Sequence, residues 1–216
     1  MSDIVDVSNK NAEFWNELCG SHLASVLGIK DASPESLKKF DDWYFNFYPY
    51  LNKHILFSDL AGSDVLEIGL GYGTVSQKLA ESGARYKGLD IAAGPVNMVN
   101  HRLSQNSLPG TAVQGSILEP PFERESFDTI IAIGCLHHTG DLKKAISQCY
   151  DLLRPGGRLT FMVYYAYSYR RFRQAPTATF KTMFKEFFGS RGVVGPSAAK
   201  ERAAYDAGSD GQGAPH

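Results

Sequence analysis

Two patterns of apolar positions alternate between about residue 64 and residue 163. Short continuous apolar runs have the length of buried strands, and longer stretches repeat apolar residues every three or four positions, as helices packed on one side do. Strands are expected at residues 65–68, 86–90, 111–114, 127–133 and 158–163. Because predicted strands and helices alternate, we expect an α/β fold with a doubly wound, mostly parallel, Rossmann-like sheet.

The first predicted strand breaks into a turn with glycine at every second position. Gly69, Gly71 and Gly73 precede a helical stretch that begins near Thr74. Glycine has no Cβ and tolerates positive φ, so this backbone can turn sharply and lie close against a ligand. The free N–H groups at the start of the next helix point to the same place. Such a turn binds either a dinucleotide or S-adenosylmethionine.

Two features of the turn bear on that choice. The G-x-G-x-x-G fingerprint of pyrophosphate binding needs its third glycine where Thr74 stands, and here that glycine comes one residue early. Glu67, at the end of the strand, would repel a pyrophosphate but attract the ammonium and sulfonium groups of S-adenosylmethionine. The pattern favours a cationic ligand, and the alternative is an ordinary strand–helix turn of another α/β protein.

Three segments carry a family resemblance. The sequence V-L-E-I-G-x-G-x-G at residues 65–73 closely resembles the first motif of class I S-adenosylmethionine-dependent methyltransferases. The L-H-H of residues 136–138 resembles the group that includes the ubiquinone and menaquinone C-methylating enzymes, and L-x-P-G-G at 153–157 is a further signature. The resemblance covers residues from about 64 to 163. It implies transfer of a methyl group from S-adenosylmethionine to a small-molecule acceptor by direct displacement, with S-adenosylhomocysteine as the product.

The resemblance also implies roles for the cofactor-binding residues. The acid that ends the second strand, Asp90, can accept hydrogen bonds from both ribose hydroxyls, which is chemistry shared with NAD-binding folds. Ser116 stands where the family often has an aspartate that contacts adenine, and a hydroxyl is a weaker acceptor. The expected set is Gly69, Gly71 and Gly73 for the amino-acid part, Glu67 for its ammonium side, Asp90 for the ribose, Ile91, Ser116 and Ile117 for the adenine, and Gly134 for close backbone approach.

Two adjacent histidines are the candidates for catalysis. His137 or His138 follows the fourth strand, and ligands bind at that end of an open parallel sheet. An imidazole can take a proton from the acceptor near neutral pH, and His138 is preferred as the base. A structural role for both is the alternative, because many methyl transfers need little beyond alignment. No metal is expected, since no other histidine has ligand spacing to this pair.

The resemblance divides the chain into three parts. Residues 1–60 are expected to form a helical lid over the substrate, 61–163 the S-adenosylmethionine-binding core, and 164–216 a helical and polar tail. The fold of the family usually has seven strands, the last two forming a hairpin beside the fifth. No sequence for them follows Val163, so we expect the sixth and seventh strands to be missing. The exposed edge of the fifth strand would then invite a homodimer.

Composition adds constraints on class and location. The chain has 216 residues, 43% hydrophobic and 21% charged, with a formal net charge of −1, so nothing global favours nucleic acid or an anionic membrane as partner. Its three separated cysteines, an acidic N-terminus and the lack of a long apolar run predict a cytoplasmic protein without disulfides. A nicotinamide-dependent oxidoreductase, and a cofactor-binding but inactive methyltransferase-like module, remain as alternative functions.

Overall fold

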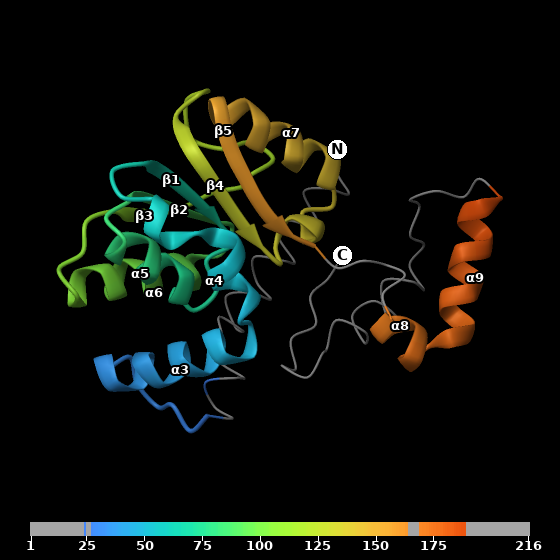
Figure 1. The fold of residues 1–216 in the computed structure, drawn as a ribbon, viewed down its shortest axis with the longest axis horizontal. Coiled ribbons are helices and arrows are strands. Elements are labelled where there is room, and N and C mark those ends of the chain that lie inside the picture. Colours follow the sequence, from blue (N-terminus) through green and yellow to red (C-terminus); the bar gives the residue numbers. More distant parts are fainter. Residues whose placement is uncertain (1–23, 25–26, 164–168, 189–216) are drawn as a thin grey trace.

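The computed structural model describes residues 24, 27–163 and 169–188, and its centre is a five-stranded sheet (Figure 1). All neighbouring strands are parallel, in the order β3-β2-β1-β4-β5. The strands are β1 (Asp64–Ile68), β2 (Arg85–Asp90), β3 (Thr111–Gln114), β4 (Phe127–Ile133) and β5 (Leu153–Met162). The order reverses between β1 and β4, which makes that junction the topological switch point where ligands of such sheets bind.

Helices cover both faces of the sheet (Figure 1). On one face, α5 (Thr74–Glu81) and α6 (Ala93–Gln105) pack over a core that includes Val65 and Ile131. On the other, α7 (Leu142–Leu152) covers a second core that includes Leu66 and Ile130. Because successive strand residues point to opposite faces, a strand buried on both sides is apolar throughout, as the sequence pattern indicated. The doubly wound α/β prediction is confirmed.

The fifth strand begins earlier than predicted. The sequence pattern predicts a strand that begins at Arg158. In the structure α7 ends at Leu152, and Leu153 already pairs with Phe127. Pairing then skips Arg154–Gly157 and resumes between Thr129 and Arg158, so these residues form a bulge within β5. A proline and a glycine with φ of +82° disfavour regular pairing there.

Two helices precede the sheet in the described part of the chain. Helix α3 (Pro34–Phe47) has two features that favour a helix start: Ser33 caps it by accepting a hydrogen bond from Ser36 N, and Pro34 occupies the first helical position. Helix α4 (Tyr50–Ile55) follows directly and contributes Leu51 and Ile55 to the core under α5. Residues 1–23 of the predicted lid lie outside the described residues.

After β5, residues 169–188 contain α8 (Tyr169–Gln174) and α9 (Pro176–Phe187), which contact each other and lie to one side of the sheet (Figure 1). Within the described residues no strand follows β5, so β5 is an edge of this sheet. The remainder of 164–216, where further strands were expected to be missing, lies outside them. No helix in the described residues is long and apolar enough to cross a membrane.

Candidate active site at the carboxyl ends of the strands

Three hydrogen bonds join the end of β2 to its neighbours, two of them to the glycine turn and one to the residue after β3. Gly69 N donates to Leu89 O at 2.9 Å, and Leu70 N donates to Asp90 Oδ2 at 2.8 Å. Gly115 N, just beyond β3, donates to Asp90 O at 2.8 Å. The carboxyl ends of β1, β2 and β3 therefore meet beside the switch point, and the predicted glycine and ribose-binding residues lie together there.

The turn has the backbone that glycine allows. Gly69, Gly71 and Gly73 have φ values of +76°, +51° and +79°. A Cβ on Gly69 would lie 2.4 Å from the Cβ of Cys135, at the end of β4, so this glycine permits close packing of two strand ends. A Cβ on Gly71, by contrast, would meet nothing within 4 Å. The exposed middle of the turn thus leaves room for a ligand to approach the backbone.

Asp90 is already held by backbone donors. Its Oδ2 accepts from Leu70 N, and its Oδ1 accepts from Ala92 N at 2.9 Å. Burial raises the pKa of Asp90, while the hydrogen bonds from Ala92 and Leu70 act in the opposite direction. Each carboxylate oxygen can accept a second hydrogen bond, so the fixed side chain is compatible with two ribose hydroxyls.

Glu67 differs from the expected ligand-facing anion. Its side chain lies beneath the turn with only 4% of the residue exposed, because β1 is covered on both faces. Glu67 Oε2 accepts hydrogen bonds from Ser76 Oγ at 2.6 Å and from Tyr86 OH at 2.8 Å. Burial raises the pKa of Glu67 from 4.5 to about 7. The electrostatic argument for a cationic ligand assumed a full negative charge on Glu67. At neutral pH only part of the Glu67 population carries that charge.

The residues expected around adenine occupy two environments. Ser116 Oγ accepts a hydrogen bond from Leu118 N at 3.2 Å, which orders the turn after β3. Ile117 is 4% exposed and packs into the core under α7, whereas Ile91 is half-buried at the end of β2. Ile91 and Ser116 therefore have more freedom to contact a ligand than Ile117 has.

The loop after β4 carries the two histidines. Gly134, with φ of +75°, donates from N to Met162 O at 3.0 Å and so joins this loop to β5. The short 3-10 helix η2 (Leu136–His138) follows, with the imidazole centroids of His137 and His138 4.0 Å apart. His138 is 7% exposed, and His137 is half-buried. Both lie at the carboxyl end of the sheet as predicted, with the preferred base the less accessible of the two.

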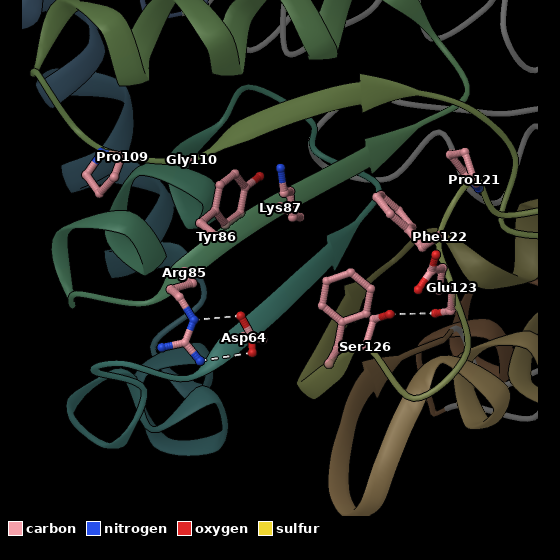
Figure 2. A pocket seen from close by; sticks show the side chains of 11 residues that line it. Asp64, Arg85, Tyr86, Lys87, Pro109, Gly110, Pro121, Phe122, Glu123 and Ser126 are labelled. Carbon is pink, nitrogen blue, oxygen red and sulfur yellow. Dashed lines mark hydrogen bonds and ion pairs between the residues drawn. The ribbon is translucent and has the colours of Figure 1, made fainter.

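A cavity of about 630 Å³ lies at the opposite, amino-terminal end of the strands (Figure 2). Asp64 and Arg85, the first residues of β1 and β2, line it and form an ion pair of 2.7 Å between Nε and Oδ1. The hydrogen bond from Arg85 holds the pKa of Asp64 well below its ordinary value. Because ligands of open parallel sheets bind at the carboxyl ends, this cavity is not the candidate active site.

The comparison with known sequences covers the same part of the chain. Residues 66–161 match the profile of a family described as a methyltransferase domain. Residues 66–161 therefore form a methyltransferase domain of the class I S-adenosylmethionine-dependent type. A ubiquinone biosynthesis O-methyltransferase from Stutzerimonas stutzeri is 29% identical over 116 residues, which make up 52% of this chain and 47% of that protein. The chain therefore spans about half the length of such curated relatives.

Solved structures share the fold of this methyltransferase domain. A putative S-adenosylmethionine-dependent methyltransferase from Methanococcus maripaludis superposes with a TM-score of 0.51 at 18% identity, covering 77% of this chain and 87% of that one. The cyclase SpnF gives a TM-score of 0.55 at 18% identity, covering 69% and 58%. Because a cyclase has this fold too, the fold alone does not specify the reaction.

Sequence reasoning missed several residues that shape the site. Cys135 packs on Gly69, its Sγ donates to Ile68 O at 2.9 Å, and burial raises the pKa of its thiol well above the ordinary value. Ser76 and Tyr86, the partners of Glu67, carried no signal, because neither belongs to a motif. In the described part of the chain, no group of three or more His, Cys, Asp or Glu side chains is arranged to hold a metal ion.

Proposed function

We propose that the chain binds S-adenosylmethionine at the carboxyl ends of β1, β2 and β4 and transfers its methyl group to a small-molecule acceptor. The observation that carries this proposal is the hydrogen bond from Leu70 N to Asp90 Oδ2, which fixes the glycine turn beside an acid suited to ribose. The methyltransferase profile over residues 66–161 separates this arrangement from that of a nicotinamide-dependent enzyme. The quinone named for the Stutzerimonas relative makes an aromatic hydroxyl a reasonable first acceptor to test.

The proposed contacts follow the strand ends. The backbone of Gly69, Gly71 and Gly73 lies along the amino-acid part of the ligand, and Asp90 accepts hydrogen bonds from the ribose. Ile91, Ser116 and, beneath them, Ile117 border the adenine, and Gly134 lets the β4 loop approach the sulfur. Glu67 acts on the ammonium side through Ser76, which it anchors in the first turn of α5. Gly71, where a side chain would enter open space, supports the fit.

Catalysis is proposed to rest on alignment. S-adenosylmethionine supplies an electrophilic methyl carbon on a sulfonium and leaves as S-adenosylhomocysteine. The protein holds the acceptor oxygen, nitrogen or carbon in line with that carbon and excludes water. His138, or its neighbour His137, takes the proton that the acceptor loses. If His138 is the base, His138→Asn lowers kcat by about a hundredfold or more and flattens the pH–rate profile. An unchanged profile would leave alignment alone as the mechanism.

The proposed location and assembly of the protein rest on its cysteines, the edge of its sheet and its net charge. Cys135 and Cys149 are free cysteines, which fits a reducing compartment such as the cytoplasm. The unpaired edge of β5 among the described strands supports a homodimer. Neither a nucleic acid nor a membrane is proposed as a partner, because the net charge is only −1.

Calorimetric titration with S-adenosylhomocysteine tests the proposal directly, with NADH as the competing ligand. We expect wild-type protein to bind S-adenosylhomocysteine and not NADH, and Asp90→Ala to lose that binding. Asp90→Asn, which keeps one acceptor oxygen, and Glu119→Ala, whose side chain is 87% exposed, are matched controls. Binding of NADH alone would establish the oxidoreductase alternative. Cofactor binding without methylation of any acceptor tried would favour the inactive module.

A further inference from the structure

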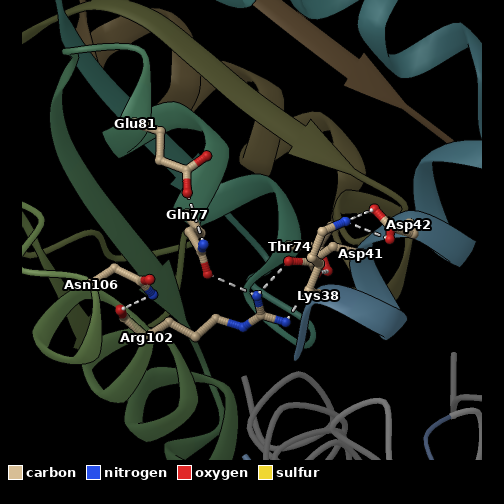
Figure 3. A network of polar contacts seen from close by, with 8 residues as sticks. All are labelled: Lys38, Asp41, Asp42, Thr74, Gln77, Glu81, Arg102 and Asn106. Carbon is tan, nitrogen blue, oxygen red and sulfur yellow. Dashed lines mark hydrogen bonds and ion pairs between the residues drawn. The ribbon is translucent and has the colours of Figure 1, made fainter. Parts of the chain in front are cut away.

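Arg102 is a buried cation that belongs to no predicted motif. It lies in the last turn of α6 with none of its side chain exposed. Its guanidinium holds both oxygens of Asp41, with NH1–Oδ2 at 2.8 Å and NH2–Oδ1 at 3.0 Å, and NH1 also donates to Gln77 Oε1 at 3.0 Å (Figure 3). A bidentate pair offsets the loss of hydration of both charges. Three helices, α3, α5 and α6, therefore meet at one guanidinium.

The same carboxylate reaches the end of the glycine turn. Thr74, the first residue of α5 and 4% exposed, donates from Oγ1 to Asp41 Oδ1 at 2.6 Å (Figure 3). Thr74 occupies the position that the pyrophosphate fingerprint would give to glycine. The hydroxyl that replaces that glycine is thus one of the groups through which α3 holds the turn.

The tyrosine inside the turn is held from two sides. Tyr72, between Gly71 and Gly73, lies against the ring of Phe40 of α3, with centroids 4.4 Å apart. The guanidinium carbon of Arg102 lies 5.5 Å from the centroid of the Tyr72 ring. An aromatic contact and a cation–π contact therefore fix the side chain at the centre of the turn.

Gly73 rests directly on the arginine. A Cβ at this position would lie 2.8 Å from Arg102 Cδ and 3.1 Å from its Nε. The backbone of the turn and the stem of the buried side chain are thus in close contact. Because of this contact, a displacement of Arg102 would shift the backbone of the turn at Gly73.

We infer that Asp41 and Arg102 are positioning residues that hold the glycine turn in the shape that receives the amino-acid part of the cofactor. The inference rests on the proposed function. It makes α3 part of the cofactor site through Asp41, Thr74 and Phe40, without direct contact to the ligand. Nucleoside recognition depends on β2 and β3 instead, so the pair acts selectively on one part of the ligand.

Two ligands separate this role from a purely structural one. S-adenosylhomocysteine carries the amino-acid group, whereas methylthioadenosine keeps the nucleoside and the sulfur but lacks that group. Affinities of both are measured by calorimetry, with competition for the weaker ligand, on the full chain. We expect Asp41→Asn to weaken S-adenosylhomocysteine about tenfold, in the usual range of coupling between sites, and methylthioadenosine less than about twofold.

The neighbouring acid provides the matched control. Asp42 pairs with Lys38 on the exposed side of α3, with side chains 61% and 72% exposed, so Asp42→Asn should change neither affinity. If Asp41→Asn does not fold, the pair Thr74→Val and Thr74→Ser decides. Thr74→Val should weaken S-adenosylhomocysteine selectively, and Thr74→Ser should bind as wild type does.

Three results would contradict the inference, and they are distinguishable. Equal loss of both ligands would reveal a general structural role, and unchanged affinities in Asp41→Asn and Thr74→Val would remove the role altogether. Failure of the wild-type chain to bind S-adenosylhomocysteine would overturn the proposed function and this inference with it.

Discussion

Glu67 is a carboxyl group whose charge depends on burial. The folded protein holds its pKa at about 7, against 4.5 for an exposed glutamate, because the side chain lies between β1, β2 and α5. Below pH 4.5 the group is protonated in both folded and unfolded chains. Between pH 4.5 and 7 only the folded chain keeps the proton, so stability falls as pH rises. The full loss, reached above pH 7, is about 3 kcal/mol.

Glu67→Gln should remove this pH dependence. Glutamine can still accept hydrogen bonds from Ser76 and Tyr86, and it never ionises. Between pH 5 and pH 8 we expect the free energy of unfolding of the variant to rise by about 2–3 kcal/mol relative to wild type, as measured by urea titration. Asp64, whose pKa is lowered from 3.8, acts in a separate window below pH 4. Glu119→Gln is the exposed control, and parallel pH curves for Glu67→Gln and wild type would refute the assignment.

Gly73 is required because its φ is positive and because a side chain there would collide with Arg102. Gly62 shares the first property and lacks the second, so comparing the two glycines separates these effects. Gly62 has a similar φ, +73° against +79°, but a Cβ there would meet nothing within 4 Å. Gly62→Ala should therefore cost only the left-handed backbone conformation, about 1–2 kcal/mol. Gly73→Ala should cost about 1–3 kcal/mol more, because Arg102 is held by Asp41 and cannot move aside freely. Thermal unfolding of both variants tests this, and equal losses would show that the contact with Arg102 is soft.

The sequence indicated some site residues and concealed others. The position of Asp90 beside the turn was predictable because this residue ends the strand that follows the turn and its helix. Arg102 and Asp41 were not, because they lie on different helices and pair only in the fold. Glu67 was located correctly, but its ionisation depends on Ser76 and Tyr86, which no motif marked. Sequence motifs therefore predict where a site residue lies more readily than they predict the neighbouring residues that set its chemistry.

Among the elements, two helices begin at side-chain caps. Ser33 and Asp141, residue types that favour this position, cap α3 and α7. The predicted start of β5, Arg158, was wrong. Proline and glycine usually interrupt strands, but here Pro155 and Gly156 form a bulge inside a strand that is already paired at Leu153. Long-range pairing, which a local pattern does not contain, overrides the local preference.

The cap of α7 lies beside the loop that carries the histidines. Asp141, three residues after His138, accepts a hydrogen bond at Oδ1 from Lys144 N at 2.9 Å. Asp141→Ala should lower the free energy of unfolding by about 1 kcal/mol, measured by urea titration. Asp141→Asn keeps an acceptor and should remain close to wild type. If the alanine variant lost nothing, the cap would be replaced by water at no cost.

At the scale of the whole molecule, the fold class follows from hydrophobic pattern alone, because a sheet buried on both faces needs apolar strands and amphipathic helices. The attachment of α3 to the glycine turn does not follow from it. That attachment depends on a buried ion pair and on the rings of Phe40 and Tyr72, which helical spacing cannot place. The element expected to act as a lid is thus joined to the turn itself, so its position and the shape of the turn are coupled.

Among the strands that the structure describes, β5 lies at an edge of the sheet, and this gives a prediction for the assembly. An edge strand offers unpaired backbone groups to a second copy, and Phe161 of β5 is 43% exposed. We expect sedimentation velocity to show self-association that grows with protein concentration. Phe161→Lys should reduce it, because a charge on an edge strand opposes further pairing. Tyr150→Lys, at a 77% exposed position on α7, is the matched control and should associate as wild type does. A chain that stays monomeric at every concentration would contradict the homodimer. If both variants lost association equally, the interface would lie on α7, or association would depend on the overall surface charge, and the edge of β5 would not be the interface.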